Sequence, residues 1–229
     1  MIGNFRDMLK SHLVIVFCSL ILLVLFLVTI FAPWLAPNDP VLVNVLHKLQ
    51  SPSLNYPLGT DHLGRCTFSR ILYGARISLG YAMLIFISAL SIGLIIGIIA
   101  GYKGGWIDQL LMRLGDGLMA IPSLLFVLGF VGIWGVGLKQ VVLGLILVQW
   151  VYYARIIRGM VLSLKEQNYI TAAKISGSST STIMKKHIIP NVLPPIAVMG
   201  TLEMGWAIMN LSSMSFLGLG VQPPIPEWG

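Results

Sequence analysis

A few polar side chains lie inside apolar runs of this 229-residue chain, and these are the first candidates for chemistry. Glu203 is the only acid deep inside such a run, and Asn210 follows it two helical turns later. A charged group at bilayer depth costs several kcal/mol, so it usually faces a cavity or a partner. Glu203 therefore either lines a pathway, where it meets a cationic substrate or a base on a neighbouring subunit, or is a protonated, hydrogen-bonded packing residue.

A second group of candidates is the set of bases between residues 154 and 187. This segment holds six Lys and Arg residues against one acid, Glu166, and supplies +5 of the formal net charge of +7. The six bases are Arg155, Arg158, Lys165, Lys174, Lys185 and Lys186. Bases near the ends of apolar spans mark the cytoplasmic side of a membrane, and a merely basic cytoplasmic loop would explain them without any further role.

Residue types for catalysis do not converge anywhere in the sequence. There is no G-x-x-x-x-G-K-[ST] phosphate loop, so the chain is not expected to hydrolyse ATP by that means. Cys18 and Cys66 are not expected to pair and have no metal-ligand spacing, and isolated histidines such as His47 and His62 are typical of a solvated surface. We expect no catalytic residue, cofactor or metal site, and no enzyme.

The elements that must position these residues are membrane-spanning helices. The sequence is 56% hydrophobic and only 10% charged. Five runs approach or exceed the roughly 20 apolar residues that a helix needs to cross a bilayer. They are residues 13–32, 78–101, 118–136, 141–153 and 188–211. Because backbone polar groups cannot stay unpaired in lipid, these runs predict an all-α membrane protein.

The order of the spans and their bases predicts an orientation. Arg6 and Lys10 place the N-terminus in the cytoplasm together with residues 154–187. Residues 33–77 then lie outside, although they carry four bases, because charge orients long loops less reliably. The chain is predicted to be a multi-pass protein of the cell (inner, cytoplasmic) membrane.

Glycines and prolines predict local features of the spans. Gly93, Gly97 and Gly101 form a stripe at four-residue spacing, which favours close helix packing rather than a direct substrate role. Pro122 predicts a kink or opening at the start of the third span. The same is expected at the start of the fifth span from Pro190, Pro194 and Pro195.

Four motifs follow one another along the chain. The first is LGTDHLGR (58–65) with SR (69–70) and GARISL (74–79); the second is Trp150, YAR (153–155) and Arg158. The third is TAA (171–173), Gly177 and HIIP (187–190); the fourth is MSFLGLG (214–220), PP (223–224) and EWG (227–229). In this order they resemble the permease subunits of ABC importers of the dipeptide/oligopeptide/nickel family.

The resemblance implies a fold and a set of partners. The fold would be that of a type I ABC-importer permease, with five of the six core helices of the family. Residues 1–77 would form an anchor helix and an extracellular loop, and residues 78–229 a permease domain that stops before its last helix. The partners would be a second permease in a heterodimer, two ABC ATPase subunits, an extracellular substrate-binding protein and the lipid bilayer, with no nucleic acid.

The resemblance also implies that residues 154–187 contain the loop that docks on the ATPase. The residues carried over to this coupling role are Thr171, Ala172, Ala173, Gly177, Lys185, His187 and Pro190. Thr171 stands where the family usually has Glu, so an acid contact with the ATPase is either absent or supplied by Glu166. Cys66 stands where an acid commonly ends the first motif, which weakens any ion pair with Arg70.

The residues leave the cargo open between two classes. Glu203 and the Met214 before the SFLGLG run resemble nickel-type permeases, whereas many peptide members carry Glu at the position of Leu211. We therefore predict import of nickel or a metal–chelator complex, with di- or oligopeptides as the alternative, along a pathway that includes Glu203 and Asn210. A secondary transporter would need internal repeats and coupling-ion sites at mid-membrane, which the sequence does not display.

Overall fold

The structure is a computed structural model that describes residues 5–229, with side chains described from residue 13 onward. Arg6 and Lys10, which carry the predicted N-terminal orientation, have side chains outside this part. The α-helices are α1 (Phe5–Leu35), α2 (Thr67–Lys103), α3 (Gly105–Met119), α4 (Ser123–Trp134), α5 (Leu138–Lys165), α6 (Asn168–Ile175), α7 (Thr180–Ile183) and α8 (Ile189–Phe216). Short turns η1 (Val45–His47, 3₁₀) and η2 (Met184–Ile188, π) complete the described elements. No strand occurs among them, so the all-α prediction is confirmed.

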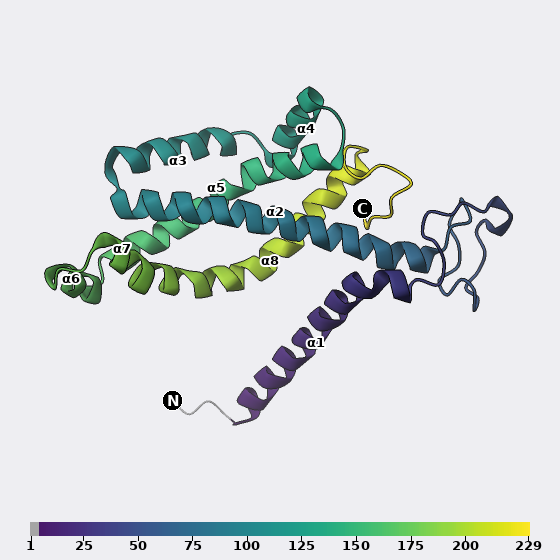
Figure 1. The fold of residues 1–229 in the computed structure, drawn as a ribbon, viewed down its shortest axis with the longest axis horizontal. Helices are drawn as coiled ribbons and strands as arrows, with labels where there is room; N and C mark the ends of the chain where they lie inside the picture. Colours follow the sequence, from purple (N-terminus) through teal and green to yellow (C-terminus); the bar gives the residue numbers. More distant parts are fainter. Residues whose placement is uncertain (1–4) are drawn as a thin grey trace. The chain divides into compact units, whose positions relative to one another are not determined.

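The helices fall into two compact units (Figure 1). The first contains the described residues up to Gly80 together with residues 223–228, and the second contains residues 81–222 and Gly229. Helix α2 begins in the first unit and continues into the second. Its 37 residues give it a length of about 55 Å at 1.5 Å per residue, more than a bilayer requires.

In the first unit, α1 confirms the first predicted span. The most apolar 18 residues within Leu13–Leu35 have a mean hydropathy of 3.3, and none of them is buried inside the protein. Leu13, Phe17 and Leu20 are all more than half exposed. Such a surface is stable only against lipid or another protein, because exposure of so much apolar area to water is unfavourable.

In the second unit, α5 is the central helix, because α3, α4 and α8 all pack against it. The glycine stripe of α2 packs against the same helix. A Cβ at Gly93 would lie 2.5 Å from the Cβ of Tyr153, and one at Gly97 would lie 2.6 Å from the carbonyl oxygen of Ala154. These distances leave no room for a side chain, so the predicted close packing of the stripe is confirmed.

Two apolar clusters form the interior of the second unit. One lies where α4, α5 and α8 meet and includes Val131, Val141 and Leu211. The other includes Ile157 of α5 and extends to Ile170 in α6. The second cluster therefore continues from the long helices into the short elements that connect α5 to α8.

The third predicted span, residues 118–136, is not one straight helix. Helix α3 ends at Met119 and α4 begins at Ser123, and the two are bent by 83°. Pro122 lies directly before α4, where its missing N–H and its restriction of Ile121 oppose a continuous helix. The opening predicted from Pro122 is confirmed. Four of the described helices can span a membrane by length and composition, or five if the bent pair is one span.

The fifth predicted span follows a π-helical turn. In η2 the backbone N–H of Ile189 bonds to the carbonyl oxygen of Met184, five residues back. Pro190 has no N–H to donate, which favours this wider turn before α8. Beyond it α8 runs without interruption through Pro194 and Pro195, so these two prolines do not end the helix.

Candidate functional site

The first candidate site is the stretch between α5 and α8, which we call the 166–188 segment. It consists of α6, a turn at residues 176–179, α7 and the π-helical turn η2. Ile170, Ile183 and Ile188 are each at most 1% exposed and belong to the cluster that contains Ile157. These three side chains fix the segment to the C-terminal half of α5 and to the start of α8.

Gly177 ends α6 in a way that only a few residue types allow. Its φ is +77°, in the left-handed region that favours glycine. Its N–H donates to the carbonyl of Lys174 (3.0 Å), and the N–H of Ser178 donates to the carbonyl of Ala173 (3.0 Å). This pair of bonds is the Schellman motif at a helix C-terminus. An added Cβ would meet no atom within 4 Å, so the requirement for glycine is conformational.

Ser179 begins the next helix. Its hydroxyl oxygen accepts a hydrogen bond from the N–H of Thr182 at 3.2 Å and lies 2.9 Å from the Thr182 hydroxyl. A Ser at this position satisfies one of the free N–H groups of a helix start. A hydroxyl of this polar turn therefore caps the following helix.

The outer face of α6 is exposed. Thr171, Ala172 and Lys174 are exposed, Ala173 is half-buried, and Ile175 is 82% exposed. Thr171 and Ile175 are four residues apart and share a helix face. Ile175 was missed by the sequence analysis, although an apolar residue directly before the polar run SGSST (176–180) is a visible signal.

The remaining predicted coupling residues lie near the start of α8 and on different faces. Lys185 and Pro190 are exposed. His187 is half-buried, and its ring lies 5.8 Å, centroid to centroid, from that of Tyr169 in α6. The carbonyl oxygen of His187 accepts a hydrogen bond from Asn191 at 2.5 Å. The structure thus places six of the seven residues in the 166–188 segment and Pro190 in the first turn of α8, and it gives His187 an internal packing role.

The basic loop is shorter than its predicted bounds of 154–187, because α5 continues to Lys165. Arg158 in α5 donates two hydrogen bonds to the carboxylate of Asp108 in α3, at 2.5 and 2.6 Å. Arg155 is paired with Asp116. The Asp108 side chain is therefore largely buried against α5, whereas Asp116 remains 62% exposed beside Arg155. The sequence distance of 39 and 50 residues between partners hides both pairs from a local pattern.

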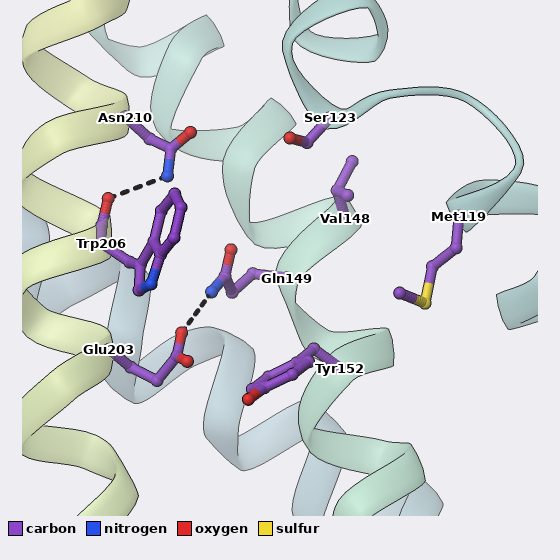
Figure 2. Close-up of a pocket in the computed structure, with 8 residues that line it drawn as sticks. All are labelled: Met119, Ser123, Val148, Gln149, Tyr152, Glu203, Trp206 and Asn210. Atoms are coloured by element: carbon purple, nitrogen blue, oxygen red, sulfur yellow. Dashed lines mark hydrogen bonds between the residues drawn. The ribbon is translucent and has the colours of Figure 1, made fainter.

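The second candidate site is a pocket between α5 and α8, beside the break that separates α3 from α4 (Figure 2). Its volume is about 380 Å³. Eight residues line it: Met119, Ser123, Val148, Gln149, Tyr152, Glu203, Trp206 and Asn210. Glu203 is 8% exposed, and its Oε2 accepts a hydrogen bond from Gln149 Nε2 at 2.7 Å and another from the Tyr153 hydroxyl at 3.4 Å.

The structure brings the two predicted pathway residues into this same pocket. The side-chain amide of Asn210 donates to the carbonyl of Trp206 within α8, at 2.8 Å. Gln149, Tyr152 and Trp206 were not predicted as lining residues. Gln149 is the one amide side chain in the apolar run 141–153, which is the signal that could have identified it.

A third group of motif residues lies in the first unit, in residues 36–66, which we call the Asp61 loop. Asp61 Oδ1 accepts from the N–H groups of Leu63 (2.9 Å) and Arg65 (3.0 Å), and Oδ2 accepts from Arg65 Nε (2.7 Å). Burial alone would raise the pKa of Asp61, but the hydrogen bonds from Arg65 and Leu63 outweigh it and lower the pKa. Arg70 Nε lies 3.8 Å from Asp61 Oδ2, so Arg70 has an acidic neighbour although Cys66 stands where the family commonly has an acid.

The glycines of this loop contact backbone directly. A Cβ at Gly64 would lie 1.7 Å from the carbonyl oxygen of Asn44, and φ at Gly64 is +74°. Residues 223–228 near the C-terminus pack in the same unit. The indole Nε1 of Trp228 donates to the carbonyl of Ile71 (3.0 Å), and the backbone N–H of Trp228 donates to the Ser78 hydroxyl (3.2 Å). The first motif and residues 223–228 of the fourth motif therefore belong to one structural unit, whereas MSFLGLG (214–220) lies in the second.

Long apolar helices, an exposed helical segment between two of them and a pocket with a buried carboxylate at a broken span are typical of one class of protein, the helical transport proteins of the membrane. Residues 93–229 match the family of binding-protein-dependent transport system inner membrane components, and residues 2–52 match the N-terminal TM domain of oligopeptide transport permease C. The chain belongs to this family, the inner-membrane permease subunits of ABC importers.

Individual relatives support the same assignment. The chain is 41% identical to the dipeptide transport system permease protein DppC of Alkalihalophilus pseudofirmus, over 98% of this chain and 74% of the relative. It is 38% identical to the nickel transport system permease protein NikC of Escherichia coli, over 92% and 76%. It is 39% identical to the glutathione transport system permease protein GsiD of Pectobacterium atrosepticum, over 98% and 74%.

These findings establish what kind of protein the chain is. It is a permease subunit of an ABC importer and, like its relatives, a transport protein rather than an enzyme. Permeases of this kind work in general with a second permease, ATPase subunits and a substrate-binding protein. The relatives are named for a dipeptide, for nickel and for glutathione, at nearly equal identity, so nickel is not favoured over a peptide.

Proposed function

We propose that this chain forms half of the translocation pathway of an ATP-driven importer, beside a different permease subunit, and that the 166–188 segment is its contact with an ATPase subunit. The observation that carries the proposal is the exposed outer face of α6. Ile175 is 82% exposed at the end of α6, a helix that the buried Ile170 holds against the rest of the second unit. An exposed apolar side chain on a well-anchored helix suits a protein interface.

The anchoring of the segment supports a mechanical role for it. Its buried isoleucines pack with Ile157 of α5, while η2 leads directly into α8. A displacement of α6 by the ATPase is transmitted to both long helices, because close-packed interiors have low compressibility. Since α5 and α8 line the Glu203 pocket, their movement would alternately expose the pathway to the two sides of the membrane.

The proposed orientation places the N-terminus and the 166–188 segment in the cytoplasm. Lys174, Lys185 and Lys186 are exposed there, which agrees with the excess of bases in cytoplasmic loops. Arg155 and Arg158 count less, since each is paired with an acid of α3. The Asp61 loop would then lie outside, where a binding protein delivers cargo.

For cargo, we propose a small polar compound of the classes that the relatives are named for. Nickel or a metal–chelator complex remains one candidate and a di- or oligopeptide the other. Reciprocal competition separates them. Uptake of labelled nickel and of labelled alanyl-alanine is measured in proteoliposomes of the assembled importer, each with an excess of the other. If only one labelled compound is taken up and an excess of the other does not reduce that uptake, the other compound is eliminated as cargo.

The ATPase contact is tested by Ile175→Glu, which adds a charge to the exposed face without disturbing a buried contact. We expect the variant to lose co-purification with the ATPase and to lower uptake at least tenfold, because a buried unpaired charge at an interface is strongly unfavourable. The matched control is Leu54→Glu, since Leu54 is fully exposed, like most of Ile175, but lies in the Asp61 loop. Equal ATPase recovery with both variants would contradict the proposal.

A further inference from the structure

The pocket between α5 and α8 contains one charged side chain. Glu203 is the only acid among the residues that line it, and none of them is a base. The bases nearer the end of α5, Arg155 and Arg158, are already paired with Asp116 and Asp108. Among the described residues, no cation forms an ion pair with Glu203.

The neighbours of Glu203 orient its carboxylate and leave one oxygen free. Gln149 and Tyr153 both donate to Oε2, and the 2.7 Å bond from Gln149 Nε2 has the length of a charge-assisted bond. Oε1 accepts no hydrogen bond from any residue of the described part. The side chain is thus held by α5 from one side while a second acceptor remains at the pocket.

Aromatic side chains form the rest of this end of the pocket. Trp206 lies one turn further along α8 and is 58% exposed, and Tyr152 lies across from Glu203 on α5 and is 39% exposed (Figure 2). The faces of aromatic rings attract cations, and they do so most strongly where water is excluded. A carboxylate beside two aromatic walls is a binding environment for an organic cation.

We propose that the Glu203 carboxylate recognises a protonated amine on the cargo, such as the α-ammonium of a peptide, with Oε1 as the acceptor and Gln149 and Tyr153 as positioning residues. This inference rests on the proposed function, since it needs the pocket to lie on the pathway. An ammonium group has three N–H donors and needs only one carboxylate and nearby aromatic faces. A bare transition-metal ion is held by several imidazole, thiolate or carboxylate ligands, and the described residues contain no group of three such side chains.

The charge of the pocket can be measured without knowing the cargo. In the assembled importer in proteoliposomes, Cys18 and Cys66 are replaced by alanine and Ser123→Cys provides one thiol at the pocket. Its rates of reaction with cationic trimethylammonium-ethyl and anionic sulfonato-ethyl methanethiosulfonate are compared. We expect Glu203→Gln to lower the cationic-to-anionic ratio by about tenfold or more, because the charge acts on both reagents in a low-dielectric site. Glu203→Asp should preserve the ratio, as should Asp39→Asn, which removes an exposed charge outside the pocket.

Recognition of an amine is tested by protection of the same thiol. Alanyl-alanine should slow the reaction, whereas N-acetyl-alanyl-alanine, which lacks the ammonium, should not. The protection should disappear in Glu203→Gln. Equal protection by both peptides, or protection by nickel chloride alone, would overturn the proposal. A thiol ratio that does not respond to Glu203→Gln would also overturn it, and a base of the second permease paired with Glu203 would give that result.

A separate readout distinguishes this inference from the proposed function. The same proteoliposomes report co-purifying ATPase and ATP hydrolysis. If these are intact while the thiol ratio ignores Glu203, only the amine inference fails. If no ATPase co-purifies, the proposed ATPase contact fails. The pocket chemistry nevertheless stands when the thiol reaction ratio and the protection by alanyl-alanine both depend on Glu203.

Discussion

The Asp61 loop and the 166–188 segment both connect long helices, but different kinds of contact hold them. In the Asp61 loop, one carboxylate accepts three hydrogen bonds from Leu63 and Arg65, and glycines such as Gly64 lie against backbone. In the 166–188 segment, buried isoleucines hold one side, while Thr171 and Ile175 leave the other side exposed.

This difference separates two reasons for a sequence motif. Most residues of LGTDHLGR (58–65) are explained by contacts within their own loop, although Leu58 and His62 are exposed. The exposed residues of α6 are not explained in that way, because neither Thr171 nor Ile175 is buried by the chain. The second loop is therefore the better candidate for contact with another protein.

The strongest test of the comparison substitutes a left-handed glycine in each loop. Gly64→Ala should cost about 3 kcal/mol or more, because it combines an unfavourable φ with an overlap against the carbonyl of Asn44. Gly177→Ala should cost only about 1 kcal/mol, because its surroundings are open. Thermal unfolding in mild detergent and the yield of monodisperse protein report the difference. Equal losses at the two positions would remove the distinction between the loops.

A second test asks whether the open surroundings of Gly177 are covered by a partner. Gly177→Glu should lower uptake at least tenfold while the protein stays folded in the membrane, because a charge would enter the interface. Gly177→Asn is the control, since Asn tolerates the left-handed conformation and adds no charge. ATP-dependent uptake in proteoliposomes is the measurement. Retained uptake in the Glu variant would mean that this turn does not contact the ATPase.

A third test concerns the two ion pairs that join α5 to α3, near the end of α5 that leads into the 166–188 segment. Arg158→Met should destabilise the protein by about 1–3 kcal/mol, because it leaves the largely buried Asp108 without its bidentate partner. Arg155→Met should cost less than about 1 kcal/mol, because both members of its pair are exposed. Unfolding temperatures of the two variants, measured side by side, check the order. The reverse order would mean that the Arg155–Asp116 pair contributes more to stability than the Arg158–Asp108 pair.

The smallest effect is a pH dependence confined to the Asp61 loop. The folded-state pKa of Asp61 lies below its unfolded value, so its contribution is complete above the unfolded pKa and is lost as pH falls through the folded pKa. We expect acid to weaken the protection of this loop from hydrogen exchange, and Asp61→Asn to remove that dependence. An acid response that persists unchanged in Asp61→Asn would have to come from another group.

The sequence allowed the long helices and the glycine stripe to be predicted, because each depends on a feature within a single segment: the length of an apolar run for the helices and a four-residue spacing for the stripe. The same holds for the opening at Pro122, since a proline acts on its own helix. The bounds were less accurate: α5 reaches Lys165, where charged residues end the apolar run without ending the helix.

Contacts between distant segments were the part that could not be predicted. The bond from Gln149 to Glu203 joins residues 54 positions apart, and nothing in either neighbourhood indicates the other. Pairing of Arg158 with Asp108 was hidden for the same reason. The exposure of Ile175 depends on which side of α6 the buried Ile170 selects, and this emerges only when the helices are packed.

The 83° bend between α3 and α4 has a consequence for the lipid around the protein. Helix α4 has 12 residues and a length of about 18 Å, well short of a hydrocarbon core of about 30 Å. If α4 crosses the bilayer by itself, the bilayer must become thinner beside it or other protein must cover the difference, and either solution varies in free energy with the length of the lipid chains. We therefore expect the stability of the importer to depend on the thickness of its host membrane, with α4 as the element that senses it.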